Sequence, residues 1–276
     1  MLEALAALVK ALLYASALSC AGVVFADFTL GSPPVIERYA TSVVRWSALS
    51  TIVACLVSSL LLVFRLGGQW NEVTLSAVFM SATGAATCLQ LAGTGLLLAS
   101  LEDPSARAMR VSSAAPITFS FAFNGHAAAQ GLPDGLIAFV HTSAVAWWIG
   151  SLCLLQHASV RLENDAFARL IHRFSGLATA MVGGLAVAGL FLIYVLDGFL
   201  ELPTVSPYER VLAVKLSLFG VLICVAAYNR RRLTPRLRAG DPGCRALLRR
   251  TIEIELALAG IILLTTAILT TYTSPA

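Results

Sequence analysis

The chain has 276 residues, of which 58% are hydrophobic and 12% are charged, and its formal net charge is +4. A soluble domain carries roughly 25% charged residues, so this composition excludes an ordinary soluble protein. Apolar runs recur along the chain, each long enough to cross the ~30 Å hydrocarbon core with about 20 residues. Continuous runs also exclude a membrane barrel, whose strands alternate over ~10 residues. The sequence predicts an all-α, polytopic transmembrane helical bundle.

The cysteine spacing, the charge distribution and the sequence motifs limit the classes of function that the chain can have. Six cysteines are scattered singly, without a CxxC pair, which argues against a disulfide framework or a zinc site. The excess positive charge lies mainly in one loop, as is typical of membrane orientation signals, so we expect no nucleic-acid partner. No hydrolase, zinc-protease or phosphate-binding motif is visible, which favours a transporter or metal-binding membrane protein over an enzyme.

We expect a single integral membrane domain over residues 1–276 with about eight spans. The first apolar segment resembles a signal-peptide core, but its basic n-region is poor, so we expect a retained helix. The fourth span contains Pro116, Asn124 and His126, and such a polar helix belongs inside a bundle or beside a cavity. The expected spans are residues 5–27, 40–64, 73–100, 112–130, 135–156, 170–197, 208–229 and 250–272.

The arginines predict the orientation of these spans. If the connections alternate across the membrane, fifteen of the nineteen Lys and Arg residues fall on one side. The positive-inside rule makes that side cytoplasmic, so both termini are expected on the outer, periplasmic side. The connection between spans seven and eight contributes most of this charge, through Arg230, Arg231, Arg232, Arg236, Arg238, Arg245, Arg249 and Arg250.

Two histidines form the main candidate site. His126 lies near the end of span four and His141 near the start of span five, on either side of a break at residues 131–135. A hairpin brings these helix ends together at the outer face, so the two imidazoles can share a metal ion. Neutral imidazole suits copper, zinc or iron. The alternative is that each histidine caps a helix end or bonds to a backbone carbonyl.

Aromatic and acidic residues near the spans have structural interpretations beside functional ones. Trp147, Trp148 and Gly150 lie about two turns deeper than His141, where small residues favour close helix packing. Alternatively, the two tryptophans form a wall that shields the histidine site from water. Glu253 and Glu255 open the eighth expected span, where carboxylates interact favourably with the helix macrodipole and need no functional role.

The other ionisable residues leave further alternatives open. Lys215 can extend its ammonium group to the outer interface, or pair with Asp197 or Glu201. His157 and His172 flank a charged inner connection, where a solvated interface is favoured. His141 and His157 are 16 residues apart on one expected helix, about 24 Å along its axis, which is a spacing that paired haems in a membrane carrier would need.

Several segments follow one another in an order and spacing typical of a known family. They are Gly125-His126-Ala127-Ala128, His141 to Gly150, Arg173-Phe174-Ser175, and residues 208–216, 229–237 and 248–256. Together they resemble the copper resistance protein D family, over roughly residues 124–270. The resemblance implies a bacterial inner-membrane protein that takes up copper at the periplasmic face, with His126 and His141 as metal ligands. Family members often carry a histidine in the first helix, where this chain has Tyr14.

The resemblance also suggests partners and accessory positions. Trp147, Trp148 and Lys215 match the family pattern, as residues whose roles are open. No copper-chaperone domain is fused to this chain, which implies a separate periplasmic copper chaperone besides the membrane lipid and the copper ion. The leading hypothesis is copper transport across, or copper handling at, the inner membrane. The alternatives are a membrane redox protein containing haem or copper, and a copper-binding assembly factor without transport.

Overall fold

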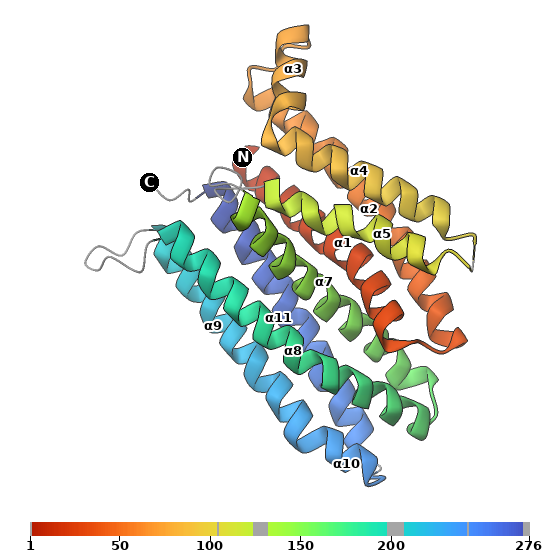
Figure 1. Ribbon diagram of the computed structural model, residues 1–276. Coiled ribbons are helices and arrows are strands. Elements are labelled where there is room, and N and C mark those ends of the chain that lie inside the picture. The colour runs from red at the N-terminus through yellow and green to blue at the C-terminus, as the bar shows by residue number, and fades with distance from the viewer. Residues whose placement is uncertain (1, 104, 124–131, 198–206, 242, 273–276) are drawn as a thin grey trace.

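The computed structural model describes residues 2–103, 105–123, 132–197, 207–241 and 243–272, and every regular element in these ranges is a helix. The long helices lie side by side in a tilted bundle (Figure 1). This confirms the all-α prediction. The elements are α1 (Leu2–Leu30), α2 (Pro34–Arg65), α3 (Glu72–Met80), α4 (Ala82–Ser100), α5 (Arg107–Phe119), the 3-10 helix η1 (Ser120–Phe123), α7 (Leu132–Arg161), α8 (Asn164–Asp197), α9 (Pro207–Tyr228), the π-helix η2 (Asn229–Leu233), α10 (Thr234–Arg238) and α11 (Cys244–Tyr272).

Seven helical segments of the described residues are long and apolar enough to cross a membrane. They correspond to seven of the eight expected spans, and they make the chain a multi-pass membrane protein. The fourth expected span, residues 112–130, coincides only in part with described residues. There α5 has 13 residues and η1 has four, fewer than the ~20 that the hydrocarbon core requires. Residues 124–130 lie outside the described residues, so a full fourth crossing stays a prediction.

The third expected span is wrong as one continuous helix, because α3 ends at Met80 and α4 begins at Ala82. Ser81 between them has an extended backbone, and its Oγ accepts a hydrogen bond from the Gly84 N–H at 3.0 Å. A serine in this geometry caps the helix that follows. A Cβ on Gly84 would overlap the backbone of Val78, so glycine permits the sharp corner. As a result α3 projects beyond the bundle (Figure 1).

The core of the bundle forms around α1, which packs against α2, α5, α7 and α11. The closest approach is to α7. A Cβ on Gly150 would overlap the backbone of Gly22, and a Cβ on Gly22 would overlap the carbonyl group of Ala146. This confirms the prediction that small residues at this point of α7 serve close helix packing.

The bundle has two chemically different ends. The first turns of α1 and the last turns of α11 meet at one end, where Lys10 Nζ donates a hydrogen bond to the Thr270 carbonyl oxygen at 3.0 Å. Figure 1 likewise shows the start of α1 and the end of α11 close together. The other end carries the α1–α2, α4–α5, α7–α8 and α10–α11 connections, and most of the arginines. We call it the arginine end.

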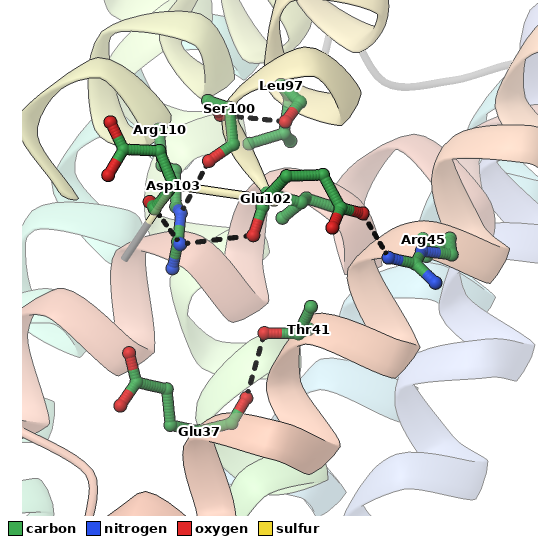
Figure 2. A network of polar contacts seen from close by, with 9 residues as sticks. Glu37, Thr41, Arg45, Leu97, Ser100, Glu102, Asp103 and Arg110 are labelled. Carbon is green, nitrogen blue, oxygen red and sulfur yellow. Dashed lines mark hydrogen bonds and ion pairs between the residues drawn. The ribbon is translucent and has the colours of Figure 1, made fainter. Parts of the chain in front are cut away.

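Arginines at this end hold the last carbonyl groups of helices. Arg110 is 9% exposed and donates to the carbonyl oxygens of Ser100, Leu101 and Asp103 at 3.3, 3.4 and 2.9 Å (Figure 2). The positive charge thus sits at the carboxyl end of α4, where the helix dipole favours it. An ion pair of 2.7 Å from Arg45 to Glu102, next in the chain after Leu101, ties α2 to the same corner.

The same arrangement recurs on α1 and α7. Arg173 on α8 donates to the carbonyl oxygen of Leu30, the last residue of α1, at 3.0 Å. Arg245 on α11 donates to the carbonyl oxygen of Ser159 at 2.8 Å and to Asn164 Oδ1 at 2.7 Å. These arginines therefore join helices that are distant in the sequence, in addition to supplying the charge asymmetry.

Candidate functional site

His141 lies on α7, nine residues after the helix begins at Leu132. At 1.5 Å per residue, this places it about 14 Å from the start of the helix. The next two residues anchor α7 to α5: Thr142 Oγ1 donates to the Thr118 carbonyl oxygen and Ser143 Oγ donates to Thr118 Oγ1, both at 3.1 Å. His141 is turned toward α8 instead.

The imidazole of His141 lies beside Gly189 on α8. A Cβ on Gly189 would lie 3.5 Å from His141 Cε1 and 3.7 Å from its Nδ1, so the ring lies directly beside α8 at this glycine. The ring also bonds to the backbone of Leu185 on α8, and Lys215 on α9 lies near enough to act on it electrostatically. Three helices therefore define the surroundings of His141.

The buried Nδ1 atom of His141 has no hydrogen-bond partner in the described part of the chain. A buried nitrogen without a partner is unusual, because buried polar atoms are nearly always paired. An unprotonated Nδ1 presents a lone pair of the kind that binds copper, zinc or iron. The chemistry of the ring therefore fits one metal ligand.

The remaining ligands are not among the described residues. His126, the expected partner, lies outside them, so the expected pair stays a prediction. Within the described ranges, no three His, Cys, Asp or Glu residues are close enough together to hold a metal ion. His141 alone does not make a metal centre, so any complete site needs His126 or another group.

The two tryptophans have packing roles. Trp147 is 2% exposed, its ring stacks on Phe174 at 5.7 Å between centroids, and its Nε1 donates to Thr29 Oγ1 at 2.8 Å. Trp148 meets the same phenylalanine edge-on at 5.8 Å. These contacts hold α7 against α1 and α8, as the packing interpretation predicts. They lie about 9–10 Å along the helix from His141, so direct shielding of its ring is not evident.

Tyr14 is buried on α1 with its hydroxyl group 3.3 Å from Thr270 Oγ1. Its ring packs edge-on against Phe121 of η1, with 5.4 Å between centroids. Tyr14 therefore joins α1, η1 and α11 through contacts of its own. The accessory role suggested for it at the copper site stays a prediction.

The other described histidines lie apart from His141. The ring of His157 stacks on Tyr39 of α2 at 3.9 Å between centroids, and His172 Nδ1 bonds with Arg238. Among the described residues, therefore, no two histidines face one another as haem ligands would. Both contacts fit the interface role expected for His157 and His172.

The structure corrects the interpretation of two acidic residues. Because α11 begins at Cys244 rather than at residue 250, Glu253 and Glu255 lie nine and eleven residues into the helix, beyond the reach of its N-terminal dipole. Glu253 is exposed and pairs with Arg249 at 3.2 Å. Glu255, in contrast, is 2% exposed. The sequence does predict that residues 253 and 255 fall on different faces of a helix. It does not indicate which of the two faces is buried.

Comparison with known proteins finds a family similarity in the second half of the chain. Residues 168–269, from α8 to α11, match the family model described as copper resistance protein D. Over this segment the chain is similar to the copper resistance protein D family. The segment that matches the copper resistance protein D model contains Arg173, Lys215 and Glu255 but neither His126 nor His141.

A curated relative points in the same direction. The chain is 28% identical over 234 residues to a protein of Bacillus subtilis (strain 168) named "Copper transport protein CutJ". The match covers 76% of this chain and 41% of the relative, so the chain spans less than half of that relative's length. No solved structure matches the chain significantly.

Proposed function

We propose that this chain transports copper across, or handles copper at, a bacterial inner membrane, and that copper enters from the end opposite the arginine end. The family match and the relative named as a copper transport protein support the choice of metal. The concentration of arginines at one end supports the orientation, because positively charged connections are retained in the cytoplasm. Under this orientation both termini are periplasmic.

The observation that carries the proposal is the buried, unpartnered Nδ1 of His141. A metal ion would complete the bonding of this atom, which the described part of the protein leaves unsatisfied. We propose that His126 supplies a second imidazole, since it precedes α7 by a few residues. A separate periplasmic copper chaperone would deliver the ion to this end of the bundle.

Lys215 gives the proposed site a transport property. Its ammonium group acts electrostatically on His141 and would oppose a cation bound there. A transport site must bind its ion strongly enough to admit it and weakly enough to release it. We propose that Lys215 weakens copper binding at His141 in this way, while the imidazole lone pair retains selectivity for a transition metal over Na⁺ or K⁺.

Copper uptake into vesicles that contain the purified chain tests the proposal. We expect uptake that depends on the protein and is lost in His141→Ala, with His157→Ala as the matched control on the same helix. Copper binding without uptake would favour the assembly factor instead. An absorption spectrum of the same preparation addresses the redox alternative, because a Soret band would indicate haem and contradict a simple copper transporter.

A further inference from the structure

A second buried polar group lies near the arginine end, between α11 and η2. Glu255 is 2% exposed and Asn229, the first residue of η2, is 8% exposed. Asn229 Nδ2 donates a hydrogen bond to Glu255 Oε1 at 2.6 Å. The two remaining oxygens of the pair, Glu255 Oε2 and Asn229 Oδ1, are buried and have no partner in the described residues. Both oxygens can only accept hydrogen bonds, so the pair lacks a hydrogen atom that one oxygen could donate to the other.

In the described part of the chain, no cation compensates Glu255. A buried carboxylate is ordinarily paired with a positive charge or bound by several donors. In the described part of the chain, the Glu255 carboxyl group is buried and accepts one hydrogen bond, from the neutral amide of Asn229. No charged side chain of the described residues acts on it. An ionised Glu255 would therefore be a buried charge that is nearly unsupported.

Among the described residues, none of the ionisable side chains on the elements that pack against α11 bonds to Glu255. On α11 itself, Glu253 pairs with Arg249 and both are exposed, and Arg245 bonds to Ser159 and Asn164. The others include, with their surroundings, Glu3 with Arg65, Lys10 with Thr270, Asp27 beside Arg107 and Arg110, His157 with Tyr39, Lys215 beside His141, Arg236 with Asp241, Arg238 with His172, and the exposed Arg161, Arg210, Tyr228, Arg230, Arg231, Arg232 and Arg250.

We propose that the Glu255–Asn229 pair is a proton-binding site near the arginine end. A proton on Glu255 Oε2 converts the carboxylate into a carboxylic acid, whose O–H donates to Asn229 Oδ1. The bond from Asn229 Nδ2 to Glu255 Oε1 remains. The planar acid and amide are then joined by two hydrogen bonds, and neither side chain has an unpaired buried oxygen. One O–H bond forms, no other covalent bond changes and nothing is oxidised.

A metal ion fits this position less well than a proton. Hard cations such as Ca²⁺ require six or more oxygens and Mg²⁺ an octahedral set, whereas this pair offers two unpaired oxygens. Within the described ranges, no third His, Cys, Asp or Glu stands near enough to complete a metal site. A proton requires only the two oxygens that are present.

The π-helix η2 links the binding of this proton to the conformation of the backbone at Asn229. The Thr234 N–H bonds to the Asn229 carbonyl oxygen five residues back, and Thr234 Oγ1 donates to the same oxygen at 3.1 Å. Single π-turns are frequent at functional positions in helices. If η2 relaxes to an α-helix, its register shifts and Asn229 rotates away from α11. Glu255 then loses its acceptor, which favours release of the proton.

Infrared spectroscopy of the full chain in copper-free detergent solution at neutral pH tests this site. A protonated carboxylic acid has a carbonyl band distinct from that of a carboxylate. We expect the acid band in the wild type and in Glu253→Gln, the exposed neighbour, and its loss in Glu255→Gln. A wild-type spectrum without an acid band, or an unchanged band in Glu255→Gln, would overturn the proposal.

A second variant covers the case in which Glu255→Gln does not fold. Asn229→Ala keeps the carboxyl group but removes its amide partner, so the acid band should shift in frequency or disappear. A band that is identical in Asn229→Ala and in the wild type would assign the acid to another residue and overturn the pairing. Because no copper is present, these outcomes are independent of the proposed copper site.

Discussion

Gly22 of α1 and Gly150 of α7 bring the two helices into direct backbone contact at the centre of the bundle. Neither position has room for a Cβ. Gly150→Ala should therefore force the helices apart and lower the free energy of unfolding by about 1–3 kcal/mol. Thermal or denaturant unfolding in detergent measures this change.

The matched control for that prediction is Gly220→Ala on α9. A Cβ there meets nothing within 4 Å, so the substitution should be neutral or add up to ~1 kcal/mol through helix propensity. Equal effects at Gly150 and Gly220 would show that the contact between α1 and α7 does not limit stability.

The proposed copper site predicts a specific loss of affinity. His141→Ala and His126→Ala should each weaken copper binding at least about tenfold, or ~1.4 kcal/mol, because each removes an imidazole ligand. His157→Ala should leave the affinity unchanged, since its ring stacks on Tyr39. Equilibrium copper titration of the purified protein provides the measurement. Wild-type affinity in both His126→Ala and His141→Ala would refute the site.

Removal of the Lys215 charge should strengthen copper binding at the same site, whereas removal of either histidine should weaken it. Replacing its ammonium group in Lys215→Gln removes a positive charge that acts on His141, so copper should bind several-fold more tightly, by roughly 1 kcal/mol. Arg210→Gln, an exposed cation on the first turns of the same helix, should change little. Weaker copper binding in Lys215→Gln would instead make Lys215 a contributor to the site.

Arg245 should stabilise the arginine end. Its guanidinium group binds the Ser159 and Leu162 carbonyl oxygens and Asn164 Oδ1, and it lies 5.3 Å above the ring of Phe167. Arg245→Ala leaves these acceptors unpaired and should cost about 2–3 kcal/mol of unfolding free energy.

The control for Arg245 is an arginine of the same end without such contacts. Arg231 is exposed, and Arg231→Ala should fall within about 0.5 kcal/mol of the wild type. Both variants remove one positive charge, so a comparison of their unfolding curves separates helix capping from net charge. A loss of stability that is the same in the two would attribute the effect to charge alone.

Asp241 should make stability depend on acid pH. Hydrogen bonds from Arg236 at 2.7 and 3.0 Å and from the Gly243 N–H hold the pKa of this carboxyl below its usual range. Because the pKa is lowered in the folded state, the stability that Asp241 contributes is complete above the unfolded pKa of about 3.9. This stability is lost as the pH falls through the folded pKa. Unfolding temperatures of the wild type and Asp241→Asn should therefore converge in acid. A difference that does not depend on pH would contradict the lowered pKa.

The arrangement of spans was predictable because hydropathy and charge are local properties of the chain. The apolar runs located seven helices, and the arginines separated the two ends of the bundle. Two boundaries were not predictable in the same way. The corner at Ser81 depends on an N-cap and on a glycine contact with α3, and the early start of α11 at Cys244 lies in a segment that is too polar to read as membrane.

The candidate site was predictable only in part. The sequence and its family resemblance singled out His141, and the structure shows that its Nδ1 is buried without a partner in the described residues. That Gly189 lies against the ring and that Lys215 acts on it could not be read from local patterns, because these residues lie on other helices far along the chain.

The sequence by itself determined that this protein is a helical, multi-pass membrane protein with one arginine-rich end, since burial in lipid requires apolar segments of sufficient length. Only the tertiary structure decided which polar groups are buried within the bundle. Glu253 and Glu255 are two residues apart, yet one is exposed and the other is enclosed beside Asn229. The difference arises because a helix turns about 200° between such positions, and the neighbouring helices decide which side is covered.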